Sequence, residues 1–137
     1  MKKTCEVMAS TSLFAGLDHE LYLEYCKDTH VHLHGKGHLI IMEGVACQGI
    51  GVIIEGQVAR QKYTPTGEFT TLNLLGPGTV FGADLIFSTH KLYPYSLEAL
   101  TLVKTIFISR EDLLALIANS SQLLLNYMSF LSDRTRE

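Results

Sequence analysis

A run of alternating histidines is the part of this sequence best suited to metal chemistry. Residues 30–34 read His-Val-His-Leu-His, and His38 follows. Side chains alternate between the faces of a β-strand, so a strand here predicts His30, His32 and His34 on one face. Three imidazoles on one face suit zinc or nickel. The alternative, a solvated outer face, is favoured because no outer ligands that would orient the imidazoles are evident, so we expect no resident metal.

A catalytic use of these histidines would resemble the cupins, which bind a metal through His-x-His and a nearby glutamate in a related barrel. Glu43 lies nine positions after His34, which is too far for the usual cupin spacing. No acid–base pair or nucleophile triad stands at usable spacing elsewhere. We therefore expect a protein that is not an enzyme, and we keep the metal-dependent cupin-type enzyme as an alternative.

The three cysteines offer a second possible chemistry. Cys5, Cys26 and Cys47 are odd in number and widely spaced, which argues against an iron–sulfur or structural zinc site. A reactive thiol needs nearby positive charge. Lys27 follows Cys26, but Asp28 comes directly after it, and Cys47 has no basic neighbour. We expect reduced, buried thiols in a cytoplasmic protein.

Short apolar runs separated by glycine and proline turns occupy the centre of the chain. A two-residue connection of hairpin length, Glu55-Gly56, joins two of them, and residues 64–67 (Thr-Pro-Thr-Gly) form a second turn. This pattern predicts an antiparallel sandwich or barrel. The expected strands are Val31–His34, His38–Met42, Gly49–Ile54, Gln57–Thr64, Phe69–Leu75, Tyr95–Ala99 and Val103–Ile108.

Helical periodicity flanks these strands. Residues 1–10 look like a loose lead-in, and residues 11–27 predict a helix capped by Asp18. Ser109 is a good N-cap for a second helix, and residues 119–121 end it. The last helix, from Gln122, is apolar around most of its circumference, which predicts packing against a second copy; the alternative is folding back on its own domain. Its expected contact residues are Leu124, Tyr127, Met128 and Leu131.

Composition limits the possible functions. The chain has 137 residues, of which 47% are apolar and 18% charged, and its net charge is −3. These values suit one domain with an accessory element. With no run of Lys or Arg, the chain should not bind nucleic acid by itself. No stretch of 18 apolar residues is present, so we expect no membrane span.

Five local motifs in order resemble the sensor domain of bacterial Crp/Fnr-type transcription regulators over about residues 12–134. They are Leu13–Leu17, Gly37–Gly44, Ile54–Val58, Leu75–Gly82 and Leu131–Arg134. The resemblance implies a mostly β fold with flanking helices: a cyclic-nucleotide-binding-like jelly-roll β-barrel, also called a double-stranded β-helix, followed by a long C-terminal dimerisation helix. It places the sensor at 1–121 and the start of that helix at 122–137. DNA contact would come only through a further domain of a parent protein, so we favour a sensor fragment.

The same resemblance implies a ligand pocket with altered chemistry. Cyclic-nucleotide-binding members carry a glutamate for the ribose where this chain has Ala83, and an arginine and a serine for the phosphate where it has Tyr93 and Pro94. The missing charge-assisted pair is worth roughly 1.5–3 kcal/mol, so we expect no cyclic AMP or cyclic GMP binding. The candidate ligand-binding residues are Phe81, Gly82, Ala83, Asp84, Leu85, Tyr93, Pro94, Tyr95 and Tyr127.

The tyrosines at these positions leave the effector open. Tyr93 and Tyr95 would suit a flat or aromatic small-molecule effector with a polar edge, although tyrosines that only pack and cap the barrel are the alternative. The sequence therefore predicts a non-catalytic, dimeric ligand sensor of unknown effector. A stand-alone dimeric interaction module with a collapsed pocket is the third hypothesis.

Overall fold

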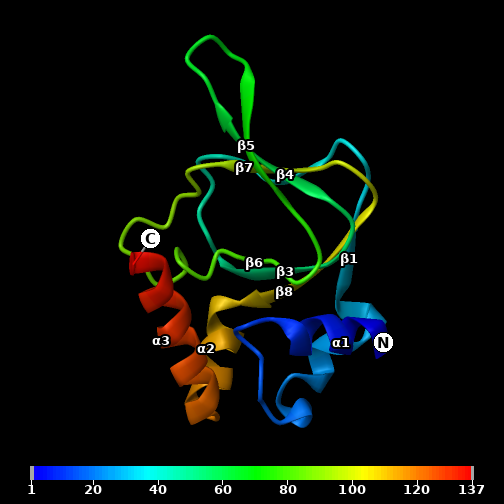
Figure 1. The fold of residues 1–137 in the computed structure, drawn as a ribbon, viewed down its shortest axis with the longest axis vertical. Helices are drawn as coiled ribbons and strands as arrows, with labels where there is room; N and C mark the ends of the chain where they lie inside the picture. The colour runs from blue at the N-terminus through cyan, green and yellow to red at the C-terminus, as the bar shows by residue number, and fades with distance from the viewer. Residues whose placement is uncertain (1, 137) are drawn as a thin grey trace.

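The fold is a two-layer β-roll with helices on one side. A computed structural model describes residues 2–136 of the chain. Two antiparallel four-stranded sheets have the orders β1-β8-β3-β6 and β2-β7-β4-β5, and Figure 1 shows the first sheet lying between the second sheet and the helices. The predicted antiparallel architecture is confirmed. The strands are β1 Val31–His34, β2 Leu39–Ile41, β3 Gly49–Glu55, β4 Val58–Tyr63, β5 Phe69–Leu75, β6 Val80–Phe81, β7 Ser96–Ala99 and β8 Val103–Ser109.

The connection at Glu55-Gly56 differs from the sequence expectation. It has hairpin length, yet β3 pairs with β6 and β8 while β4 pairs with β5 and β7. The connection therefore carries the chain from one sheet to the other. Gly56 has φ +100°, and a Cβ there would lie 2.4 Å from the Leu102 carbonyl oxygen, so the crossing requires glycine. The turn at 64–67 does join paired strands, β4 and β5.

The N-terminal segment was assigned incorrectly from the sequence. Residues 2–10 form helix α1 (Lys2–Ser10) instead of a loose lead-in. Residues 11–27 contain two short 3-10 helices instead of one longer helix, η1 (His19–Leu21) and η2 (Leu23–Cys26), and η3 (Asp28–His30) follows. Asp18 does act as a cap, because its Oδ1 accepts from the Glu20 N–H at 3.1 Å. Helical spacing from Leu21 to Tyr25 did not indicate how short each turn would be.

The C-terminal helices follow the predicted boundaries closely. Helix α2 spans Arg110–Ala118, and Ser109 caps it by accepting from the Asp112 N–H at 3.1 Å. Helix α3 spans Ser121–Arg136, which is 16 residues or about 24 Å. Asn126 ties α3 to the N-terminal loop by donating to the carbonyl oxygens of Leu13 and Ala15 at 3.0 and 2.9 Å. None of the helices in residues 2–136 has the length and apolar character that a membrane crossing needs.

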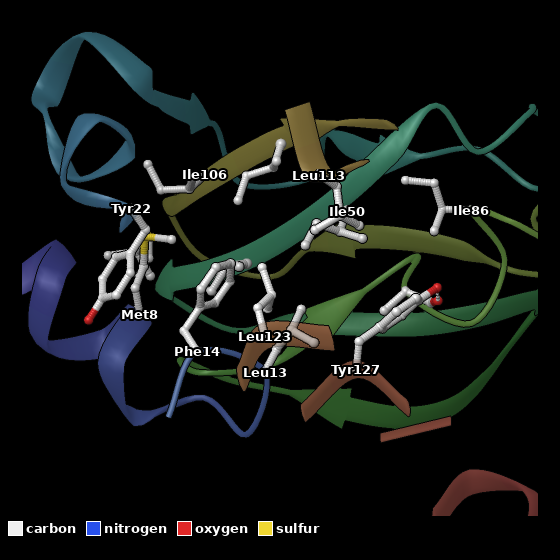
Figure 2. Close-up of a cluster of buried hydrophobic side chains, with 14 of the residues drawn as sticks. Met8, Leu13, Phe14, Tyr22, Ile50, Ile86, Ile106, Leu113, Leu123 and Tyr127 are labelled. Carbon is white, nitrogen blue, oxygen red and sulfur yellow. Dashed lines mark hydrogen bonds between the residues drawn. The ribbon is translucent and has the colours of Figure 1, made fainter. Parts of the chain in front are cut away.

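Two apolar clusters hold these layers together. The first lies between the helices and the sheet of β3 and β8, where Met8, Phe14 and Leu123 are fully buried (Figure 2). The second lies between the two sheets and contains Ile53, Val58, Phe81, Leu97, Ala99 and Val103. Residues of β3 alternate between the clusters, as strand geometry requires. The inner faces of the two sheets therefore pack around the second cluster.

Candidate functional site

The segment Gly82–Leu85, which we call the cassette, leaves the inter-sheet space directly after β6. Gly82 has φ +89°, and a Cβ there would lie 2.6 Å from Tyr93 Oη and 2.8 Å from the Gly49 carbonyl oxygen. Only glycine meets both demands. The cassette forms a turn, not a helix: the N–H groups of Leu85 and Ile86 donate to the Gly82 carbonyl oxygen at 3.1 and 3.0 Å. Those two donors are thus directed to the protein and not toward a ligand.

The tyrosines expected to line a pocket are packed to different degrees. Tyr93 is 3% exposed, and its hydroxyl lies 3.6 Å from Cys47 Sγ. Burial, followed by contact with Cys47, raises the Tyr93 pKa well above its usual range. The Tyr95 ring stands 5.7 Å from the Tyr93 ring and is only half-buried, while Pro94 is exposed. The buried Tyr93 side chain therefore packs against Gly82 of the cassette, whereas the Tyr95 ring remains partly exposed to solvent.

Helix α3 holds the cassette from the other side. Tyr127, which is 6% exposed, donates its hydroxyl to the Ala83 carbonyl oxygen at 2.7 Å. Burial raises the pKa of Tyr127 to about 12, with Asp84 adding to the effect, so the hydroxyl keeps its proton at neutral pH. Arg134 Nη2 lies 3.1 Å from Asp84 Oδ2. Asp84 is thus committed to α3 and is not directed at a sugar hydroxyl.

Arg60 is a candidate ligand-binding residue that the sequence reasoning missed. It follows Val58 by two positions on β4 and pairs across to Leu97, so it shares the inner face with those core residues. Its guanidinium carbon stands 5.1 Å from the centre of the Tyr95 ring, and its Nε is buried without a hydrogen-bond partner among the described residues. The signal in the sequence was weak, because Lys62 follows Arg60 two positions later and only Val58 marks this alternation as inward.

The histidines are divided by the fold. His30 lies in η3 and its Nε2 stands 3.4 Å from Glu24 Oε1, whereas His32 and His34 share the inner face of β1. His34 Nε2 is 2.9 Å from Thr105 Oγ1, and burial, with His32 and His38 nearby, lowers its pKa. Glu43, the proposed cupin ligand, accepts from the Tyr63 N–H at 3.0 Å. The expected common face of three imidazoles does not form, because His30 precedes the strand.

A cavity of about 220 Å³ opens beside His32 and His34. We call it the hollow. Phe81, predicted as a cassette-side ligand contact, lines this hollow instead. Its walls are mostly apolar, which favours uncharged ligands or none. The lining residues are His32, His34, Ile40, Ile41, Phe81, Thr105 and Phe107.

The expectation of three reduced thiols is wrong for two of them. Cys5 on α1 and Cys26 on η2 form a disulfide, and Cys47 is free and buried. The residues are 21 positions apart, but the turns after α1 bring their Cα atoms to 5.2 Å. Chain spacing alone could not show this proximity. Within residues 2–136, one group of three side chains could hold a metal ion, with ligand atoms all within 4.8 Å of one another: Cys5, His19 and Cys26. None of the three histidines that the sequence suggested as metal ligands belongs to this group.

The predicted dimerisation residues face two directions. Leu124 and Met128 are 43% and 57% exposed, and Leu125 beside them is 60% exposed. Tyr127 is buried against its own cassette, and Leu131 is half-buried against the helix-side cluster. One side of α3 therefore packs on its own β-roll, while the other presents an apolar strip.

The family is decided by comparison with known proteins. Residues 32–120 match the model of the cyclic nucleotide-binding domain. The chain belongs to this family. The match spans β1 to the end of α2, so it includes the cassette, the hollow and Arg60. No curated protein matches the chain by sequence.

Several solved structures of other proteins are similar in fold to this cyclic nucleotide-binding domain. The sensor domain of the transcriptional regulator DNR from Pseudomonas aeruginosa aligns with TM-score 0.80 and 20% identity, over 98% of this chain and 91% of that one. A transcriptional regulator from Thermotoga maritima gives 0.76 and 21%, over 88% and 91%. The catabolite activator protein of Thermus thermophilus gives 0.77 and 27%, over 92% of this chain and 59% of its own length. The solved structures that resemble this chain thus include transcriptional regulators and a sensor domain of one.

Proposed function

We propose that this cyclic nucleotide-binding domain is the ligand-sensing and dimerisation unit of a Crp/Fnr-type transcription regulator. The observation that carries the proposal is the double link between cassette and α3, from Tyr127 to Ala83 and from Arg134 to Asp84. A ligand that moves the cassette must also move or strain this helix. In a regulator, that coupling would carry the signal to a DNA-binding domain elsewhere in the parent protein.

The effector we propose is a flat anion other than cyclic AMP or cyclic GMP. Arg60 supplies a positive charge on the inner face, and its buried Nε has an unused donor. One face of the Tyr95 ring lies under the Arg60 guanidinium, and the ring is half-buried, so its exposed part could contact a flat ligand. An aromatic carboxylate would satisfy both groups, through a charge-assisted hydrogen bond and ring contact. Cyclic nucleotides would lack their usual glutamate and arginine, because Ala83 and Tyr93 occupy those positions.

The switch follows from the charges around Tyr95. Its pKa is raised by burial and by Asp84, while Arg60 and Arg134 act in the opposite direction, so all three charges lie near this ring. An anion bound at Arg60 would repel Asp84 and attract Arg134, which weakens their ion pair. Exposed pairs of this kind are worth about 0.2–1 kcal/mol, so a modest binding energy can shift the position of α3.

The dimer contact we propose is the exposed strip of Leu124, Leu125 and Met128 on α3. Three neighbouring exposed apolar side chains on a helix favour association with a second identical helix, which buries the strip on both copies. A Leu124→Glu/Met128→Glu double variant should be monomeric in analytical ultracentrifugation if the wild type is dimeric. Ser132→Glu, an exposed change on the same helix, should keep the wild-type mass. A monomeric wild type would contradict the dimer proposal.

A ligand panel tests the sensing proposal. We expect 1-naphthoate to raise the unfolding temperature of the full chain and the neutral 1-naphthamide to have no effect. A ligand at 100 times its dissociation constant stabilises by about 2.7 kcal/mol. Arg60→Gln should abolish the shift. Arg110→Gln is the matched control, because Arg110 also stacks on a ring, Phe87 at 5.2 Å, and also has a buried unpartnered Nε, but lies on α2.

Other outcomes of the panel would contradict specific parts of the proposal. A saturable shift with cyclic AMP would show that the missing glutamate and arginine are not needed. Equal increases in unfolding temperature with the acid and the amide would show that the positive charge of Arg60 does not contribute to binding. No shift with any anion, together with a dimeric wild type, would favour the dimeric interaction module.

A further inference from the structure

Three metal-ligand side chains meet at the junction of α1 with the 3-10 turns, far from the cassette in sequence. Cys5 comes from α1, His19 from η1 and Cys26 from η2. One ligand atom from each, two sulfurs and an imidazole nitrogen, lies within 4.8 Å of the others. His19 Nε2 is 3.0 Å from Cys5 Sγ. The ligating nitrogen thus already points at the sulfur pair.

Packing fixes each of the three ligands. Met8, one helical turn after Cys5, is fully buried beside Tyr22 in the core (Figure 2), which sets the rotation of α1. The Asp18 cap orders η1, and the His19 ring packs edge-on against Tyr22 at 5.5 Å. Cys26 is fully buried, and its Sγ lies 3.8 Å from the Tyr22 carbonyl oxygen. The cluster is thus preorganised by the core and not by a mobile loop.

A structural disulfide alone does not account for the imidazole. A disulfide needs two sulfurs, whereas two thiolates and a histidine form a donor set typical of zinc. Three protein ligands leave a fourth position for water or an exogenous ligand. His19 is exposed and Cys5 half-buried, so an ion has a path to the cluster from solvent.

We propose that Cys5, His19 and Cys26 form a Zn²⁺ site when the Cys5–Cys26 disulfide is reduced. A dithiol donates two electrons and two protons to the disulfide and becomes a disulfide itself, which leaves two thiols on the protein. As Zn²⁺ binds, both thiols release their protons to solvent and form S–Zn bonds, while neutral His19 contributes the Nε2 lone pair. Because both forms use the same sulfurs, disulfide and zinc exclude one another.

Either form links α1 to η2 and so holds the N-terminal helix on the β-roll. With Cys5 and Cys26 reduced and metal-free, α1 keeps its apolar contacts through Met8 but loses the bond between the two elements. The site therefore makes the attachment of α1 depend on thiol redox state and on zinc. This inference is independent of the effector proposed for the cassette.

Cobalt titration of the phosphine-reduced full chain tests the site directly. We expect one equivalent of Co²⁺ to give thiolate-to-cobalt charge-transfer absorption with the visible bands of tetrahedral Co²⁺, and Zn²⁺ to displace it. The oxidised chain should give none of these bands. Each of the single variants Cys5→Ser and Cys26→Ser should lose the charge-transfer absorption that the two cobalt-bound thiolates give together. Cys47→Ser, which removes the free buried cysteine, is the matched control and should titrate like the wild type.

His19 distinguishes the three-ligand site from a simple dithiol. His19→Gln changes an exposed side chain, so circular dichroism should show an intact fold. Since loss of an outer hydrogen bond to a ligand already costs 10–100-fold in affinity, loss of the ligand itself should weaken Co²⁺ binding by roughly 100-fold or more. His90→Gln, in an exposed turn, should bind normally. Unchanged affinity in His19→Gln, or absence of charge-transfer absorption in the reduced wild type, would overturn the proposal.

Discussion

The cassette, which packs in the apolar cluster on the helix side, and the hollow, which opens between the two sheets, are built in opposite ways. At the cassette, Gly82, Tyr93 and Tyr127 are buried, Tyr93 packs against Gly82, and Tyr127 bonds the segment to α3 through Ala83. At the hollow, about 220 Å³ remains open, and the polar groups are two imidazoles on the edge strand β1 and the Thr105 hydroxyl on β8. Of these two regions, the hollow has open volume but no described bond to α3, and the cassette is bonded to α3 but closely packed.

This difference is the reason we place the effector at Arg60 and not in the hollow. A ligand in the hollow would contact β1, β2 and β8, which the core already holds. A ligand at Arg60 would act on Tyr95, Asp84 and Arg134, which connect to a helix. Sensing requires differential contact with two states, and the contacts of the second position with α3 are the reason we propose it.

Glycine substitution should break the cassette most severely. Gly82→Ala forces a side chain into positive φ and into the Gly49 carbonyl oxygen, so we expect a loss of roughly 2–5 kcal/mol in unfolding free energy by urea denaturation. Gly78→Ala is the matched control: its φ is also +89°, but its Cβ would meet nothing closer than Ser10 Oγ at 3.7 Å. It should cost about 1–2 kcal/mol. Equal losses would show that the cassette is not closely packed.

Removal of one hydroxyl tests the bond from the cassette to α3. Tyr127→Phe leaves the Ala83 carbonyl oxygen without its 2.7 Å partner, and an unpaired buried acceptor costs about 1–3 kcal/mol. Tyr63→Phe, at a side chain 53% exposed, should leave stability unchanged within about 0.5 kcal/mol. Thermal unfolding of both variants gives the comparison. If Tyr127→Phe matched Tyr63→Phe, the coupling that carries the sensing proposal would be absent.

The hollow should tolerate a change that the cassette would not. Thr105→Val removes the 2.9 Å contact with His34 but keeps the size of the side chain and adds a methyl group to an apolar wall. We expect a change in unfolding free energy of about 1 kcal/mol or less, because His34 can turn toward the open cavity. Urea denaturation measures it. A loss larger than that of Tyr127→Phe would mean that the hollow is the better-packed region.

The smallest expected effect is a pH dependence from His34. Burial lowers its pKa in the folded state, with His32 and His38 adding to the shift, so the unfolded chain binds the proton more readily. Stability should therefore be full above pH about 6.5 and decline as pH falls below the unfolded value. His34→Gln should flatten this decline, and His90→Gln should not. A decline that His34→Gln leaves unchanged would assign the pH response to other groups.

Much of the β-roll could be predicted because local patterns determined it. Seven of the strands observed were expected within a few residues, since alternation and glycine turns act over short stretches. The two-residue β6 was missed because it is too short to show a period. Of the ligand candidates, Ala83 and Tyr127 are hydrogen-bonded to each other, Phe81 faces the hollow and Asp84 is held by Arg134, and ligand binding by any of them stays a prediction. Which neighbour a side chain meets depends on contacts distant in sequence.

By itself, the sequence determined the fold family and the absence of the usual cyclic-nucleotide charges, because both depend on residue identity at fixed spacing. Only the tertiary structure decided that β3 and β4 belong to different sheets, that Cys5 reaches Cys26, and that Arg60 stands over Tyr95. Each of these depends on how segments far apart in the chain pack. Packing is set by the sum of many weak apolar contacts, and no local pattern encodes that sum.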